Sequence, residues 1–196
     1  MTTNPAPSDT ELLRQMRAGT AAAFEALYLR HQGPLFRFAI LRSGSADAAA
    51  DVVQEVFMGL LTGSFKFDPL RGLLQNFLFG VARNLVMRLD PPTSRDAAQR
   101  ETDDDDDAAR EAVCDAAEPL ARMLANEQAE ALRRALALLP PHYRDVVILY
   151  EMHDLSYLEI ADICQLDIGT VRSRLSRGRA ALAKRLAAHR PATHHA

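Results

Sequence analysis

The sequence predicts an all-α fold of two small helical domains joined by an acidic, flexible linker. β-branched residues are sparse and rarely alternate with polar residues, so strands are not expected. Apolar residues recur at spacings of three and four on both sides of residues 91–118. That middle segment is polar, includes the consecutive aspartates 103–107, and buries too little apolar surface to offset its ordering entropy. We therefore place the domains at 1–92 and 126–190 and the linker at 93–125.

The first two helices of the first domain are indicated by residues that commonly cap helices. A short helix begins at Asp9, which we expect to be its N-cap. A longer helix follows Thr20. We expect it to break or kink at Gly33-Pro34, because proline removes a backbone donor and its ring clashes with the preceding turn.

The helix predicted over 46–61, with Ser45 as its cap, has two chemically different faces. The apolar face, which we expect to pack into the core, contains Val52, Val53, Val56, Phe57, Leu60 and Leu61. The opposite side carries Asp47, Asp51, Gln54 and Glu55. A loop over 63–72 then leads to a helix over 73–89, which ends before Pro91. This helix is also apolar on one face, and its other side carries Asn76, Arg83, Asn84 and Arg88.

The second domain begins with two predicted helices between residues 126 and 154. Ser156 and Glu159 then form an S-x-x-E capping box, which opens a short helix over 157–164. Asp167 caps the basic helix that follows. Two helices joined by about three residues, the second of them basic, are typical of a helix-turn-helix.

Positive charge is concentrated on this last helix, although the whole chain has a net charge of −3. Residues 168–190 contain seven basic side chains and no acidic one. At about 100° per residue, one side of the helix is apolar and must pack inward, namely Ile168, Val171, Leu175 and Leu182. The outward side has small and hydroxyl residues at its centre and guanidinium groups around it, namely Gly169, Thr170, Ser173, Ser176 and Arg177, flanked by Arg172 and Arg174.

An outward face of this composition can enter the major groove of DNA and bond base edges or phosphates. The other interpretation is a solvated, arginine-rich helix. That interpretation does not explain the capping box, the short turn and the absence of acids together. DNA binding also accounts for the local positive charge, because only this face must meet phosphates.

Other classes of protein are not indicated. The longest apolar runs fall short of the roughly 20 residues of a membrane span, and the N-terminus lacks the features of a signal peptide, so a cytoplasmic protein without membrane insertion is expected. No nucleophile elbow, Walker motif or GxGxxG loop occurs, so we expect neither an enzyme nor a bound cofactor. Cys164 is expected in the core and Cys114 in the linker, and no set of residues is spaced to bind a metal.

Two stretches resemble one protein family. ADVVQEVFMGLL and FDPLRGLLQNFLFGVARNLV resemble region 2 of bacterial RNA polymerase sigma factors, and LPPHYRDVVILYEMHDLSYLEIADICQLDIGTVRSRLSRGRAAL resembles their region 4. A chain with only these two regions resembles the extracytoplasmic-function (ECF) group. The resemblance implies a factor that directs the polymerase core to promoters and helps to open the −10 region. It also implies control by an anti-sigma factor or another regulatory protein.

The resemblance assigns roles to residues that match the family's motifs. Docking on polymerase would use Asp51, Gln54 and Glu55. Reading of the −10 element would use Phe65, Lys66, Arg83, Asn84 and Arg88. Reading of the duplex −35 element would use Thr170, Arg172, Ser173, Arg174 and Arg177. The acidic linker would be a solvated spacer, or a mimic of nucleic acid on the path by which RNA leaves the polymerase.

Two other hypotheses remain at this point. One is a helix-turn-helix regulator that binds duplex DNA without polymerase. The other is an interaction module that has lost DNA binding and titrates polymerase or a regulator. The 46–61 helix and the FDPLRG loop favour the sigma factor, because a plain repressor needs neither. The basic end of the 73–89 helix stops at Arg88, which keeps the interaction module open.

Overall fold

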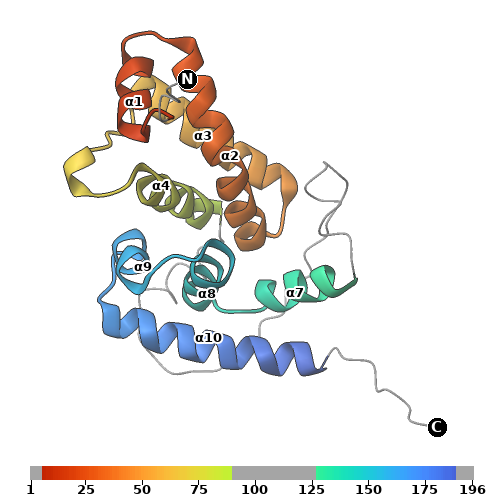
Figure 1. The fold of residues 1–196 in the computed structure, drawn as a ribbon. Helices are drawn as coiled ribbons and strands as arrows, with labels where there is room; N and C mark the ends of the chain where they lie inside the picture. The colour runs from red at the N-terminus through yellow and green to blue at the C-terminus, as the bar shows by residue number, and fades with distance from the viewer. Residues whose placement is uncertain (1–5, 90–126, 189–196) are drawn as a thin grey trace, which may run out of the picture.

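The computed structural model describes residues 6–89 and 127–188, and every regular element in these two ranges is a helix. The predicted all-α fold is therefore confirmed for them. Figure 1 shows two groups of helices, an N-terminal group (α1–α4) and a C-terminal group (α7–α10). The predicted linker, 93–125, lies outside the described residues.

The N-terminal group begins with α1 (Asp9–Arg17) and α2 (Ala21–Ser43). The hydroxyl of Ser8, not the carboxylate of Asp9, accepts the capping hydrogen bond from the Glu11 backbone N–H, so the predicted cap was one residue too late. Asp9 instead pairs with Arg30 and His31 of α2. This pairing fixes the start of α1 against the middle of α2.

α2 runs through Pro34 as one helix, so of the break or kink predicted at Gly33-Pro34 the break is absent. The residues on either side of the proline, including Leu27, Leu35 and Phe38, are buried in the core. This packing holds the helix together although proline removes one backbone hydrogen bond.

The next two helices complete this group. α3 (Ala46–Thr62) is capped by Ser45, as predicted, and its apolar face is buried except for Leu61, which is 50% exposed. A 3₁₀-helix, η1 (Pro69–Arg71), leads to α4 (Leu74–Leu89). Both α3 and α4 pack against α2.

The C-terminal group contains α7 (Glu127–Ala137), α8 (Pro141–His153), α9 (Tyr157–Cys164) and α10 (Ile168–Ala188). The predicted capping box is present, with the Ser156 N–H donating to Glu159 Oε2 over 2.9 Å. The Asp167 carboxylate accepts from the Thr170 N–H over 2.8 Å, as expected for the cap of α10. The helix-turn-helix predicted from the sequence is confirmed.

The two groups are packed together rather than separate. α8 and α7 lie against α2, and α9 lies against α4. Buried side chains of both groups belong to one hydrophobic cluster. α10 packs on α7, α8 and α9, on the side that faces away from the N-terminal group (Figure 1).

Gly178 allows α10 to cross α8 at close range. A Cβ atom at this position would lie 2.7 Å from Cγ2 of Val147 and 3.3 Å from Cβ of Tyr143. Gly178→Leu should therefore lower the free energy of unfolding by about 1–3 kcal/mol, because the added atoms force the two helices apart. Chemical denaturation monitored by circular dichroism measures this change.

The matched control is Ala180→Leu, which adds a similar volume to an exposed position of the same helix. It should leave the unfolding midpoint nearly unchanged. Equal stability of the two variants would show that α10 and α8 have room to separate at no cost.

Candidate nucleic-acid interface

The outward face of α10 is held in place by its buried side. Val171 and Leu175 are fully buried against the other helices of the C-terminal group. On the opposite side Arg172, Ser173 and Arg177 are exposed. The predicted inward and outward faces are thus confirmed for this part of the helix.

Two residues predicted on this surface are only partly exposed. Thr170 is half-buried, and its hydroxyl donates to Asp167 Oδ2 over 2.6 Å. Hydrogen bonds from the Thr170 side chain and backbone lower the pKa of Asp167, so its carboxylate remains charged at the start of α10. Arg174 is also half-buried and lies on the side of α10 that faces His142. The exposed contact surface is therefore narrower than the helical wheel suggested.

Aromatic rings orient two arginines of α10. The Arg172 guanidinium lies 5.7 Å from the centroid of the Tyr157 ring, and that of Arg179 lies 4.8 Å from the Tyr150 ring. The two rings stack with their centroids 5.3 Å apart. Arg179 also donates to Glu151 Oε1. Arg179 was not among the predicted DNA-binding residues, although its position seven residues after Arg172 places both on one side of the helix.

The predicted polymerase-docking residues lie on the solvent side of α3. Asp51, Gln54 and Glu55 are all exposed. Met58 and Leu61 are half-exposed beside them, which was not predicted. Met58 follows Gln54 by four residues and Leu61 follows it by seven, so helical spacing could have placed them on the same side. The surface is an acidic and amide patch continued by two apolar side chains.

The residues predicted to read the −10 element lie in different environments. Lys66, Asn84 and Arg88 are exposed. Phe65 is half-buried because its ring lies over Gly59 of α3, where a Cβ atom would approach the ring to 2.1 Å. In this position Phe65 packs against a helix, so its ring is not fully available for stacking on a base.

Arg83 and Asn76 face the C-terminal group, so the prediction that this side of α4 is open was wrong for both. Asn76 is 8% exposed, and its amide donates to Glu159 Oε1 of α9 over 3.3 Å. The Nε atom of Arg83 donates to Asp145 Oδ2 of α8 over 2.7 Å. The packing of α8 and α9 on α4 covers these side chains. Helical periodicity could not predict this burial, because it depends on contacts between distant parts of the chain.

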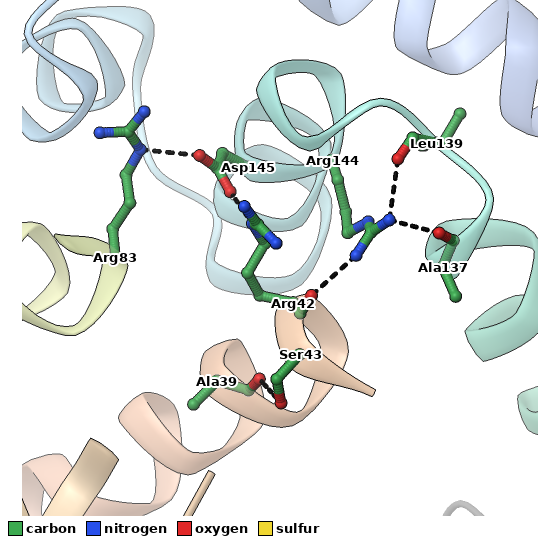
Figure 2. A network of polar contacts seen from close by, with 8 residues as sticks. All are labelled: Ala39, Arg42, Ser43, Arg83, Ala137, Leu139, Arg144 and Asp145. Atoms are coloured by element: carbon green, nitrogen blue, oxygen red, sulfur yellow. Dashed lines mark hydrogen bonds and ion pairs between the residues drawn. The ribbon is translucent and has the colours of Figure 1, made fainter. Parts of the chain in front are cut away.

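Asp145 is at the centre of a polar network between the two groups (Figure 2). Its carboxylate is 2% exposed and also accepts from Nε of Arg42, which is 1% exposed. The neighbouring Arg144 donates to the backbone oxygens of Arg42, Ala137 and Leu139. Asp145 and Arg144 are neighbours in α8. Together they bind the C-terminal ends of α2 and α7 and the Arg83 side chain of α4.

The His153 ring packs against Phe38 and Phe79 where the two groups meet, and these aromatic side chains form the His153 slot. Its ring centroid lies 4.7 Å from that of Phe79 in α4 and 6.4 Å from that of Phe38 in α2. Burial lowers the pKa of His153 to about 4, with a further contribution from Arg37 and an opposing one from Asp154. In the part of the chain that the structure describes, its buried Nε2 atom has no hydrogen-bond partner. The slot therefore holds the neutral imidazole.

The remaining predictions concern a reactive cysteine, a metal site and a membrane span, none of which the sequence indicated. Cys164 is buried, and burial raises the pKa of its thiol to about 12, so it is not a reactive thiolate. Cys114 lies outside the described residues. Across residues 6–89 and 127–188 no group of histidine, cysteine and acidic side chains is placed to bind a metal ion, and no helix is long and apolar enough to cross a membrane.

These features define a class of protein. A helix-turn-helix with a basic outward face, packed on a second helical group with an exposed acidic patch, is the architecture of a DNA-binding transcription protein. Comparison with known proteins makes the class specific. Residues 27–89 match the family described as "Sigma-70 region 2", and residues 129–182 match "Sigma-70, region 4".

Curated relatives match over most of the chain. The RNA polymerase sigma-H factor of Pseudomonas aeruginosa is 30% identical over 184 residues, 91% of this chain and 93% of the relative. The ECF RNA polymerase sigma factor SigM of Mycobacterium tuberculosis is 33% identical over 182 residues, 91% of this chain and 85% of the relative. The chain therefore belongs to the ECF RNA polymerase sigma factors and acts in promoter-specific initiation of transcription.

Solved structures agree with this assignment. The sigma factor RpoE of Bartonella quintana, determined in complex with the anti-sigma factor NepR, superposes with a TM-score of 0.59 at 27% identity, over 85% of this chain and 98% of that chain. The structure of CnrH in complex with the cytosolic domain of CnrY gives a TM-score of 0.67 at 24% identity, over 94% of this chain and 100% of that chain. The latter similarity supports the fold.

The His153 slot predicts a specific pH dependence of stability. The folded protein keeps His153 neutral down to about pH 4, whereas the unfolded chain protonates it near pH 6.5. The unfolded state therefore gains a proton first as the pH falls, and stability is lost. Between pH 7 and pH 5 this residue should remove about 2 kcal/mol from the free energy of unfolding.

His153→Phe keeps an aromatic ring in the slot and removes the titration. Denaturant unfolding of both proteins at pH 7, 6 and 5 isolates the effect, because all other groups titrate in both. The wild-type protein should lose stability more steeply than the variant. Parallel pH profiles would contradict the assignment of a neutral buried imidazole.

Proposed function

We propose that three surfaces of this chain divide the work of promoter recognition. The observation that carries the proposal is the helix-turn-helix, whose basic outward face is exposed while Val171 and Leu175 anchor its other side. Arg172, Ser173 and Arg177 then contact the −35 duplex in the major groove. Thr170 and Arg174 lie at the margin of this contact.

The second surface is the exposed side of α4 and the loop before it. Lys66, Asn84 and Arg88 supply ammonium, amide and guanidinium groups that can hold an unpaired −10 strand. Arg83 joins them once it leaves Asp145, and Phe65 once its ring leaves Gly59. The short basic end at Arg88 makes this group of contacts small, so the −10 contact depends on tethering by the other two surfaces.

The third surface docks on the polymerase core. Asp51, Gln54 and Glu55 provide charge and hydrogen bonding, and Met58 and Leu61 provide apolar area beside them. Such a combination suits a basic partner surface with apolar pockets. The chain acts in the cytoplasm, where the polymerase is. A regulatory protein of the anti-sigma type is its further partner, by analogy with the Bartonella factor solved with NepR.

The two alternative functions lack this support. A polymerase-independent regulator has no use for the region 2 match over 27–89 or for the acidic patch on α3. An interaction module without DNA binding has no use for an exposed arginine and serine face on a well-anchored α10.

Two arginines of α10 should differ in their effect on DNA binding. Arg177 lies nearer the centre of the outward face and should read a base, so Arg177→Ala should cost about 1–3 kcal/mol and relax the preference at one base pair. Arg172 lies at the edge, over Tyr157, and should hold a phosphate. Arg172→Ala should weaken all sequences alike and reduce the salt slope by about one.

The measurement uses the full chain and a pool of DNA duplexes from which the preferred sequence is first selected. Binding to that sequence and to a scrambled version is then followed at several salt concentrations. Lys184→Ala, an exposed change further along α10, is the control and should preserve the base preference. Wild-type affinity and salt slope in both arginine variants would show that α10 does not enter DNA.

Charge reversal on α3 tests the docking surface. Asp51→Lys combined with Glu55→Lys should weaken binding to the polymerase core at least about tenfold, because like charges then meet across the contact. Competition against a labelled wild-type chain measures this affinity. The control, Glu25→Lys with Asp162→Lys, makes the same change in net charge at exposed positions elsewhere. Equal core affinity of both double variants would mean that the α3 patch is only a solvated surface.

A further inference from the structure

The contact between the two groups buries the side of α4 that carries Arg83. This side chain is 13% exposed and turned toward Asp145, and Asn76, two turns earlier on the same side of α4, is held by Glu159. In contrast, α10 has its main contacts within its own group, and its outward face remains exposed. The arrangement in this structure thus leaves the −35 surface open and covers part of the −10 surface.

Asp145 offers Arg83 the same chemistry as a DNA phosphate. A carboxylate and a phosphate each present anionic oxygens that a guanidinium binds through charge-assisted hydrogen bonds. The Nε atom of Arg83 donates to one oxygen of Asp145 over 2.7 Å, and Nε of Arg42 donates to the other over 2.5 Å. While the contact is closed, Arg83 cannot use this N–H for a nucleic-acid strand.

The physical character of the contact suits reversible opening. Burying charges costs several kcal/mol per ion, and the attraction within the pair roughly offsets that cost. When the groups separate, all three charged side chains regain water, so separation loses little electrostatic energy. Removing only the acid is different, because it leaves Arg42 and Arg83 facing each other at a buried position without Asp145 between them.

We propose that Asp145 is an internal latch, which holds the C-terminal group over α4 and keeps the free chain from binding the −10 strand until the two groups separate. This inference rests on the proposed role of α4 in −10 binding. The latch explains why an acidic side chain lies fully buried on α8, with both of its hydrogen-bond donors on the other group. The His153 ring in its Phe38 and Phe79 slot adds an apolar part to the same closure.

Asp145→Asn tests the latch, because it removes the charge and keeps the shape. Neither of the ion pairs it breaks lies within the C-terminal group, so the helix-turn-helix keeps its own contacts. In the full chain the variant should increase the radius of gyration measured by X-ray scattering. It should also raise affinity for a fluorescein-labelled pool of random single-stranded DNA about tenfold, by increasing the fraction of open molecules. Affinity for the selected −35 duplex should stay unchanged.

Two controls make the result specific. Asp162→Asn removes the same charge from an exposed site on α9 and should change neither shape nor binding. Adding Arg83→Ala to Asp145→Asn should abolish the gain in single-strand affinity, because the released guanidinium is what binds. A gain that persists without Arg83 would overturn the proposal.

A second variant tests the separation of the two groups independently, so the result does not depend on correct folding of Asp145→Asn. His153→Lys places a charge in the aromatic slot when the groups are closed and in water when they are open. It should produce the same increase in size and in single-strand affinity. A folded variant of either kind that keeps the compact shape would overturn the latch, and so would one that opens without any gain in single-strand binding.

The proposed role of α4 is tested separately. Asn84→Ala and Arg88→Ala alter exposed residues outside the latch, and promoter opening by the assembled holoenzyme reports on them directly. Reduced opening in these variants, together with an unchanged shape of Asp145→Asn, would remove the latch and keep the −10 function. Unchanged promoter opening in these variants, together with an open Asp145→Asn variant that gains no affinity for single-stranded DNA, would contradict both the latch and the proposed −10 role of α4.

Discussion

The position of the two helical groups depends on one buried carboxylate. Asp145 is inaccessible to water and accepts hydrogen bonds from Arg42 and Arg83, which lie on two different helices of the N-terminal group. A buried charge tolerates few geometries, because its partners must approach at hydrogen-bond distance from fixed directions. An apolar contact alone would allow the groups to slide. The ion network therefore sets the orientation of the two groups in the closed arrangement.

α2 transmits this constraint through the molecule. It is a single helix of 23 residues, about 34 Å long, that packs on α1, α3 and α4 and presents its C-terminal end to α7 and α8. At that end Arg42 supplies a side-chain donor to Asp145 and a backbone acceptor to Arg144. Continuity through Pro34 matters here, because a break would uncouple the N-terminal core from the contact with the C-terminal group.

The features predicted correctly from the sequence are those that depend on residues within a single helix. The Ser45 cap, the Ser156 and Glu159 capping box, the inward face of α10 and the solvent face of α3 all follow from spacings within one helix, and the structure has them. The covered side of α4 could not be predicted in this way. Arg83 and Asp145 are 62 residues apart, and a buried arginine has the same helical spacing as an exposed one. Its burial depends on which helices meet, and that is decided by packing across the chain.

The tyrosines beneath α10 have a consequence for the entropy of DNA binding. Arg172 and Arg179 lie over the rings of Tyr157 and Tyr150, which stack on each other. A freely rotating arginine loses about 2 kcal/mol of rotamer entropy when it is fixed. Where a ring already restricts the guanidinium, part of this loss occurs during folding and not during association. In the proposed contact of Arg172 with DNA, Tyr157 would therefore help to set the affinity, and a change at Tyr157 would alter binding while the arginine itself is retained.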